Sequence, residues 1–170
     1  MKDPGPRLPH TLTITVDNEA GALARIVGLF SARGYNIESL TVADISEEHD
    51  ISRITIVTTG TEHVIEQISA QLERLIPVHK VTDLTARGGH VEREMALVKV
   101  AGTGEDRLEA MRLAHIYRAR VVDATMESFI FEITGSAEKV DQFIALMRQI
   151  GLVEIGKSGI VAIARGSEAG

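Results

Sequence analysis

The chain has 170 residues, enough for one large domain or two small ones, with 44% hydrophobic and 25% charged residues, as in ordinary globular proteins. A net charge of −6 and an aromatic content of 4% argue against a general phosphate-binding surface and against base stacking. The absence of cysteine excludes disulfides, thiolate metal sites and a cysteine nucleophile. Because the apolar stretches run only a few residues, we expect no membrane span. The lack of cysteine is consistent with a reducing compartment, and we expect a cytoplasmic protein.

The first predicted elements are a strand and a helix. Residues 1–9 contain three prolines and no apolar core, so we expect a flexible tail there and not a signal peptide. Thr11–Val16 alternates threonine with apolar residues, which predicts a half-buried strand. Asp17 or Asn18 can cap the helix that follows, and Gly34 falls where that helix should end. The apolar stripe of this helix is Leu23, Ile26, Val27 and Phe30.

The next elements complete one folding unit. Asn36–Ile45 and Ile51–Thr58 are predicted to be strands joined by an acidic turn. Thr61 can cap a second helix, which should stop near Pro77, and Val78–Leu84 is a closing strand. The apolar stripe of the second helix is Ile65, Ile68, Leu72 and Leu75. The order strand, helix, strand, strand, helix, strand predicts four antiparallel strands with two helices on one face.

A similar pattern follows a linker at residues 86–91. The expected elements are a strand at Met95–Val100, a helix at Glu105–His115, strands at Arg120–Thr125 and Phe129–Thr134, a helix at Ala137–Ile150 capped by Ser136, and a strand at Val153–Ala164 interrupted by KSG. The apolar stripe of the last helix is Val140, Phe143, Ile144 and Met147. We therefore predict an α+β fold of two tandem ferredoxin-like (βαββαβ) units, with domains at 10–85 and 92–166 and a short tail at 167–170.

No catalytic pattern is found in the sequence. The six histidines have no metal-ligand spacing, and neither a phosphate-binding G-K-[ST] loop nor a G-x-S-x-G nucleophile is present. RNA-recognition domains share the predicted topology, but they need aromatic residues on the central strands. Here those strands read TLTITV and ISRITIVT. We expect no catalytic residue, no metal site and no nucleic-acid partner.

A glycine stands in the first turn of the first predicted helix. Gly21 costs about 1 kcal/mol relative to alanine at such a position, and close approach of a ligand to the backbone is one reason to accept it. The first turn presents unpaired N–H groups and a positive partial charge, which suit a carboxylate. The small neighbours Ala20 and Ala22 leave the turn accessible. The residues alone leave two interpretations open: a well-built helix, or a helix start that binds a small acid.

The run DNEAGALARIVGLFSARGYNIESLTVA and the later HVEREMALVKV resemble the regulatory (small) subunits of acetolactate synthase, also named acetohydroxyacid synthase. The resemblance covers about residues 10 to 166. It implies that the first unit is an ACT domain, a ligand-binding fold. It also implies a subunit without an active site or cofactor of its own, which activates a large catalytic subunit and confers feedback inhibition by valine. Thiamine diphosphate, magnesium and FAD are expected on that large subunit.

The resemblance also implies where the effector lies. In the family, two ACT domains pair as a homodimer, and the effector lies at their junction. The predicted valine site is formed by Asn18, Ala20, Gly21, Ala22 and Leu23 of one chain with Asn36 and Ile37 of the neighbouring chain. We expect N–H groups near Gly21 to bind the carboxylate and the two asparagines to orient the ammonium. Leu23 and Ile37 would then pack against the isopropyl group.

The second unit is expected to contact the large subunit, or to form a second dimer contact. The polar residues expected there, as partner contacts that relay effector binding, are His90, Glu92, Arg93 and Glu94. Ordinary exposed charge is the equally weighted alternative for these four residues. Two other functions stay open: an ACT-type amino-acid sensor for a different enzyme, and a dimerisation module with an empty site. No membrane partner is expected.

Overall fold

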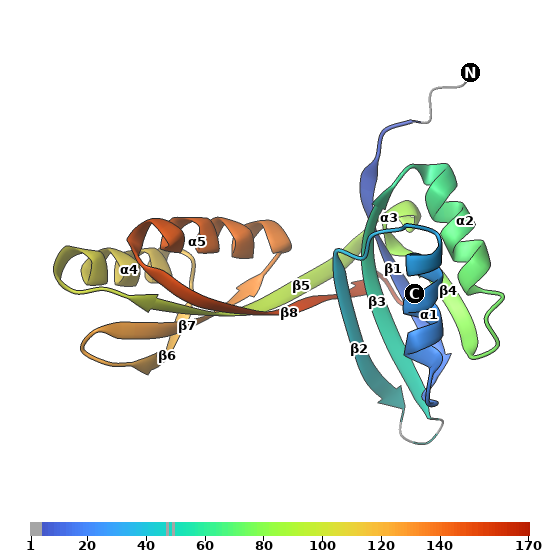
Figure 1. The fold of residues 1–170 in the computed structure, drawn as a ribbon, viewed down its shortest axis with the longest axis horizontal. Coiled ribbons are helices and arrows are strands. Elements are labelled where there is room, and N and C mark those ends of the chain that lie inside the picture. The colour runs from blue at the N-terminus through green and yellow to red at the C-terminus, as the bar shows by residue number, and fades with distance from the viewer. Residues whose placement is uncertain (1–4, 47, 49) are drawn as a thin grey trace. The chain divides into compact units, whose positions relative to one another are not determined.

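The computed structural model describes residues 5–46, 48 and 50–170. Part of the predicted tail (1–4) and two residues of the acidic turn, Glu47 and His49, lie outside the described residues. The chain forms two compact units, one of residues 1–91 and 160–170 and the other of residues 92–159. The unit boundaries fall inside two long strands, β5 (His90–Ala101) and β8 (Leu152–Ala164) (Figure 1). Residues 160–166, which the predicted limits place in the second domain, thus pack in the first unit.

The first unit has the predicted order of strands and helices. Its elements are β1 (Leu8–Asp17), α1 (Ala22–Ala32), β2 (Ser39–Ser46), β3 (Ile51–Gly60), α2 (Glu62–Leu72), β4 (Val78–Asp83) and a short α3 (Leu84–Arg87). The antiparallel sheet has the order β2-β3-β1-β4. Two boundaries differ from the prediction: β1 begins inside the expected tail, and α3 occupies part of the expected linker. Asp83 explains this helix, because its carboxylate accepts hydrogen bonds from the amides of Thr85 and Ala86.

The core of the first unit lies between the sheet and the helices α1 and α2. Thr61 caps α2 as predicted, with its hydroxyl accepting from the Val64 amide at 3.4 Å. The fully buried positions of this core are Leu12, Ile14, Ile26, Phe30, Ile54, Ile56, Ile65, Ile68 and Leu72. Leu23 is wrong as a member of the buried stripe, because it is 39% exposed. Its place is taken by Ala22, which lies four residues before Ile26 and so shares its face of α1.

The prediction that the first strand is half-buried is also wrong. Leu12 and Ile14 face the helices, but Thr11 and Thr13, which point to the opposite face, are each only 4% exposed. The sheet face opposite the helices is therefore also covered, by segments of the first unit for which the sequence predicted no such contact. One of them is α3, whose Thr85 hydroxyl accepts a hydrogen bond from the Thr11 amide.

The second unit repeats the topology of the first. Its elements are β5, α4 (Gly104–Ile116), β6 (Arg120–Ala124), β7 (Ser128–Gly135), α5 (Ala137–Ile150) and β8. The sheet has the order β6-β7-β5-β8, which corresponds strand for strand to the first sheet, with α4 and α5 on one face (Figure 1). The predicted α+β fold of two ferredoxin-like units is confirmed.

The core of the second unit matches its predicted stripe. Ser136 caps α5, with its hydroxyl accepting from the Lys139 amide at 3.3 Å. The four predicted apolar residues of α5, Val140, Phe143, Ile144 and Met147, are all buried. The expected interruption of the last strand by KSG is wrong, because β8 runs without a break through Lys157, Ser158 and Gly159. The Ser158 hydroxyl accepts a hydrogen bond from the Met95 amide at 3.0 Å, which holds this part of β8 beside β5.

Two further observations concern only the part of the chain that the structure describes. None of its helices has both the length and the apolar character needed to cross a membrane. No three or more histidine, aspartate or glutamate side chains in these residues gather as metal ligands.

Candidate functional site

The start of α1 differs from the expected cap. The helix begins at Ala22, and its N-cap is Gly21, with φ +88° and no side-chain hydrogen bond. The predicted capping role of Asp17 or Asn18 is therefore wrong, because the chain makes a further turn before the helix begins. The positive φ explains why a glycine stands at position 21, since a residue with a Cβ is strained in this conformation. A Cβ at this position would nevertheless meet no atom within 4 Å, so the space beside Gly21 is open.

Main-chain hydrogen bonds hold the loop that leads into α1. The Asn18 amide donates to the Asp50 carbonyl at 2.6 Å, and the Ala22 amide donates to the Glu19 carbonyl at 3.2 Å. Among the described residues, the amides of Leu23 and Ala24 have no hydrogen-bond acceptor, as is usual in the first turn of a helix. These two amides are free donors in a region of positive partial charge, which suits a carboxylate.

The other end of α1 is closed by a glycine, as predicted. Gly34 has φ +68°, its amide donates to the Ser31 carbonyl at 3.2 Å, and the Tyr35 amide donates to the Phe30 carbonyl at 2.9 Å. This is the Schellman pattern of helix termination, and the rings of Phe30 and Tyr35 add an edge-to-face contact with centroids 6.2 Å apart. The chain therefore turns sharply and delivers Asn36 to the region just before β2.

Asn36 and Ile37 precede β2, which begins at Ser39 and not at Asn36 as predicted. The Asn36 carbonyl accepts a hydrogen bond from the Thr58 hydroxyl at 2.6 Å, which fixes its backbone while its side chain is exposed. The 11 residues of α1, at about 1.5 Å rise each, make a helix about 16 Å long, with Gly21 just before its first residue and Asn36 after its last. The two groups of predicted effector residues thus lie at opposite ends of one helix and do not meet within one chain.

The predicted effector residues differ in exposure. Ala22 is 3% exposed and turns toward the core, whereas Leu23 is 39% exposed and Ile37 is partly buried against the core. The remaining predicted residues of the helix start, Asn18, Ala20 and Gly21, are exposed. An exposed leucine beside two free amides places an apolar group and hydrogen-bond donors on one helical turn.

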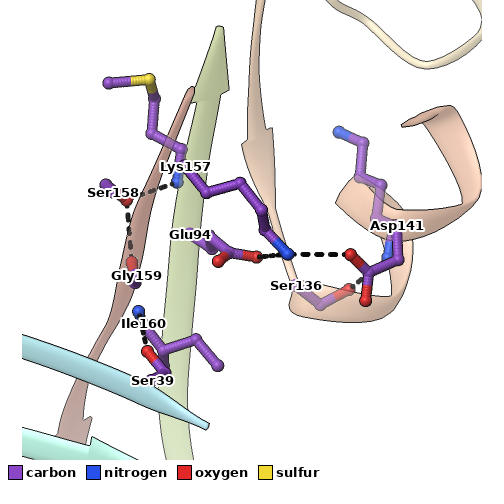
Figure 2. Close-up of polar contacts among 10 residues, drawn as sticks. Ser39, Glu94, Ser136, Asp141, Lys157, Ser158, Gly159 and Ile160 are labelled. Carbon is purple, nitrogen blue, oxygen red and sulfur yellow. Dashed lines mark hydrogen bonds and ion pairs between the residues drawn. The ribbon is translucent and has the colours of Figure 1, made fainter. Parts of the chain in front are cut away.

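The four polar residues predicted at the start of β5 do not share one environment. Arg93 is exposed, whereas Glu94 is 5% exposed, so the alternative of ordinary exposed charge is wrong for Glu94. Lys157 of β8 lies between two acids, with Nζ 3.3 Å from the Glu94 carboxylate and 2.9 Å from the Asp141 carboxylate (Figure 2). Burial opposes the charged form of Lys157, but the hydrogen bond that it donates to Asp141 and the charges of both acids outweigh burial and raise the pKa of Lys157.

The face of the second sheet opposite its helices carries a hollow. Its volume is about 230 Å³. It is lined by Leu97, Lys99, Ile130, Glu154 and Gly156. Lys99 donates to the Glu154 carboxylate at 2.6 Å, and this hydrogen bond lowers the pKa of Glu154. The hollow is therefore lined by the apolar side chains of Leu97 and Ile130 and by the ion pair of Lys99 with Glu154.

Two comparisons with known proteins decide the family. Residues 93–166 match the family described as the small subunit of acetolactate synthase, and residues 12–80 match the ACT domain of AHAS small-subunit-like proteins. A probable acetolactate synthase small subunit from Archaeoglobus fulgidus is 47% identical over 161 residues, which are 95% of this chain and 99% of the relative. The chain belongs to the acetolactate synthase small-subunit family.

Other members of the small-subunit family agree over nearly the full length. The acetolactate synthase isozyme 3 small subunit of Escherichia coli is 44% identical over 158 residues, 92% of this chain and 96% of the relative. The crystal structure of the acetolactate synthase small subunit from Thermotoga maritima covers 95% of this chain and 99% of its own chain, with 40% identity and a TM-score of 0.83. The predicted resemblance is thereby confirmed, and the first unit is an ACT domain.

Two features of this small-subunit chain escaped the sequence analysis. Asp50 has a positive φ of 48° and its carbonyl holds the loop before α1, which the composition of the acidic turn did not indicate. The ion pair of Lys157 with Glu94 joins residues 63 positions apart, so no local pattern predicts it.

Proposed function

We propose that this chain is the regulatory subunit of acetolactate synthase, which activates the large catalytic subunit and makes it sensitive to feedback inhibition by valine. Membership of the small-subunit family and the ACT domain support this role. The chemistry would belong to the large subunit, together with its thiamine diphosphate, magnesium and FAD. This chain would contribute an effector site and a surface for its partner.

The observation that carries the effector site is the separation of its two halves along α1. Gly21 and Asn36 lie at opposite ends of an 11-residue helix, so a pocket that uses both requires two chains. We therefore propose a homodimer of ACT domains, in which the helix start of one chain faces Asn36 and Ile37 of the other. Two symmetric sites would follow from one two-fold axis.

The chemistry of the helix start suits the two ends of valine. The free amides of Leu23 and Ala24 would bind the carboxylate, and Asn18 with the partner chain's Asn36 would orient the ammonium. Burying the isopropyl group against Leu23 and Ile37 contributes roughly 1.5–3 kcal/mol, and each charge-assisted hydrogen bond roughly as much. Several kcal/mol of lost freedom oppose binding, so we expect affinity in the micromolar to millimolar range.

The test compares two substitutions of Gly21. Both Gly21→Asp and Gly21→Ala place a Cβ on a backbone with φ +88°, which costs up to about 1–2 kcal/mol, but only aspartate adds a carboxylate beside the free amides. We expect Gly21→Asp to abolish valine binding in calorimetry and valine inhibition of the reconstituted enzyme, while activation of the large subunit persists. Gly21→Ala should keep measurable binding.

Equal valine affinity in the Gly21→Asp variant and the parent chain would show that the effector lies elsewhere. Co-purification with the large subunit separates this function from an amino-acid sensor of a different enzyme. A chain that binds valine but neither binds nor activates the acetolactate synthase large subunit would contradict the proposed partner.

The surface we propose for the large subunit is the face of the second sheet that is opposite its helices. Arg93, Met95, Leu97 and Lys99 alternate along β5 with buried residues and so share this face. Met95 is 37% and Leu97 42% exposed, and the hollow lies among them. Arg93 stays a proposed contact, whereas Glu94 can act only indirectly, because its carboxylate is buried beside Lys157.

A further inference from the structure

The end of β8 packs on the sheet of the first unit, where side chains of β2 and β3 hold it by hydrogen bonds. Its residues Ile160–Ala164, here named the strap, belong to the first unit. The Ser39 hydroxyl accepts from the Ile160 amide at 2.8 Å, and the Thr41 hydroxyl donates to the Ile160 carbonyl at 2.9 Å (Figure 2 shows the Ser39 contact). The amide and the carbonyl of Ile160 are thus both held by side chains of β2.

The strap covers the face of the first sheet that is opposite α1 and α2. Ile160 and Ala162 are 8% and 5% exposed, whereas Val161 and Ile163 are 57% and 61% exposed. Arg53 of β3 adds a hydrogen bond of 3.2 Å from its guanidinium to the Ala162 carbonyl. The alternation shows that one side of the strap packs on the sheet, on the face to which Thr11 and Thr13 point.

Side chains make these three contacts with the first sheet, whereas main-chain hydrogen bonds pair β8 with its neighbour β5. A sheet ladder would resist single substitutions, but each of these bonds depends on one hydroxyl or one guanidinium. Their net contribution is about that of ordinary hydrogen bonds, which are individually modest. A small movement of β2 can therefore change how firmly Ile160 is held on the first sheet.

Ser39 stands next to the proposed effector residues in the chain. It is the first residue of β2 and follows Ile37 by two positions and Asn36 by three. Between them, the Glu38 amide donates to the Val57 carbonyl at 2.8 Å, which connects this short segment to the sheet. A displacement of Asn36 and Ile37 would therefore need to pass through only two peptide units to reach Ser39.

The strap continues directly into the part of β8 that is anchored in the second unit. Two residues before Ile160, the Ser158 hydroxyl holds the Met95 amide, and three residues before it Lys157 pairs with Glu94 and Asp141 (Figure 2). The covalent chain from the Ser39 contact to the buried Glu94 pair is thus four residues long. Glu94 is among the residues that the sequence suggested as a relay.

We propose that Ser39 and Thr41 are positioning residues that couple the effector site to β8, so that the strap carries the effect of valine along the chain. This inference rests on the proposed function and assigns the regulation of the same site. Coupling requires that valine favour one of two states of an element. The element is the strap, with Ile160 held more tightly by Ser39 and Thr41 in one state than in the other.

The test separates valine binding from valine inhibition. Ser39→Ala and Thr41→Val are made singly and together in the full chain and assayed with the large subunit. Thr15→Val is the matched control, because Thr15 shares the same sheet face on β1 and has no hydrogen bond to the strap among the described residues. In the double variant we expect the calorimetric Kd for L-valine to stay within threefold of the parent value. The valine concentration for half-inhibition should rise at least fivefold, within the usual range of coupling.

A double variant that valine inhibits as strongly as the parent enzyme overturns the coupling role and leaves the proposed function intact. A parent chain that binds no valine overturns the proposed function and this inference with it. Amide hydrogen exchange in the unsubstituted dimer gives a check that does not depend on folding of the variants. Saturating L-valine should change the exchange rate at Ile160 at least fivefold, and an unchanged rate contradicts the proposal.

Discussion

The two units have the same strand order, but they treat the faces of their sheets differently. In both, two helices cover one face and enclose an apolar core. In the first unit the other face is also covered, and Thr11, Thr13 and Thr55 are each 4% exposed. In the second unit the corresponding face exposes Met95 and Leu97 and carries the hollow. One fold thus gives a sheet closed by its own chain and a sheet open to another molecule.

This difference shows how a duplicated topology can divide two tasks. The strap covers the first sheet and is held by Ser39, which follows the proposed effector residues Asn36 and Ile37 in the chain, so that unit is suited to sensing. The open apolar face of the second unit is suited to contact with a partner, because large exposed apolar groups together commonly mark interaction sites. The following substitutions test each half of this comparison.

The largest effects are expected in the two separate cores. Phe143 and Phe30 are 0% and 1% exposed, and truncation of a buried phenylalanine to alanine costs about 3–5 kcal/mol. Because the residues belong to different clusters, Phe143→Ala should raise amide exchange mainly in α5 and β7, and Phe30→Ala mainly in α1 and β1. Equal acceleration across both units in either variant would show that the cores are not independent.

A pair of adjacent substitutions tests whether the strap closes the first sheet. Ala162 is 5% exposed and Ile163 61% exposed, so a glutamate is buried at the first position and solvated at the second. We expect Ala162→Glu to reduce the free energy of unfolding by about 2–3 kcal/mol and Ile163→Glu to change it by less than about 0.5 kcal/mol. Chemical denaturation measures both, and equal losses would mean that the strap does not pack by one side.

Most of the architecture was predictable because its signals are local. The stripe of α5, the caps Thr61 and Ser136 and the stop at Gly34 each depend on residues within a few positions of one another, and all were confirmed. The start of α1 was not predictable in the same way, since the sequence offered Asp17 and Asn18 as caps, whereas the helix begins after Gly21. Only the backbone conformation at Gly21 decides among them.

The features that escaped prediction depend on contacts between distant parts of the chain. The strap lies 119 residues from Thr41 in sequence, so the burial of Thr11 and Thr13 had no local cause. Glu94 is similar, because ordinary exposed charge was one interpretation of the polar residues at this strand start, whereas Lys157 compensates the buried carboxylate from another strand. The effector residues came from resemblance to the family, and the sequence pattern alone left them undecided.

The next smaller effect concerns the buried Glu94 in the second unit. Lys157→Met leaves this carboxylate without its cation, which we expect to cost about 2 kcal/mol, less than for a fully buried pair because the Lys157 side chain is partly exposed. The double variant Glu94→Gln/Lys157→Met should recover part of the loss, since no charge is then left buried. A double variant less stable than Lys157→Met would contradict a role for the charge pair.

The pH dependence of this pair has a defined sign. Because the pKa of Lys157 is raised, its contribution is complete below the ordinary lysine pKa and is lost as the pH rises through the folded-state value. The stability difference between the parent chain and Lys157→Met should therefore shrink in strongly alkaline solution. A difference that grows there would mean that packing of the lysine stem, and not its charge, is what the substitution removes.

Substitutions on the open face of the second sheet are expected to have the smallest effect on stability. Their effect on binding of the large subunit should be large. Leu97 is 42% exposed, so Leu97→Glu should change the free energy of unfolding by less than about 0.5 kcal/mol. The same substitution puts a charge on the floor of the hollow, and we expect it to weaken co-purification with the large subunit at least tenfold. Val161→Glu is the control, because Val161 is 57% exposed on the strap of the closed sheet. If both variants retain the large subunit equally, the open face is not the partner surface. The contrast between the two sheets would then reflect how each unit folds, with the partner bound elsewhere.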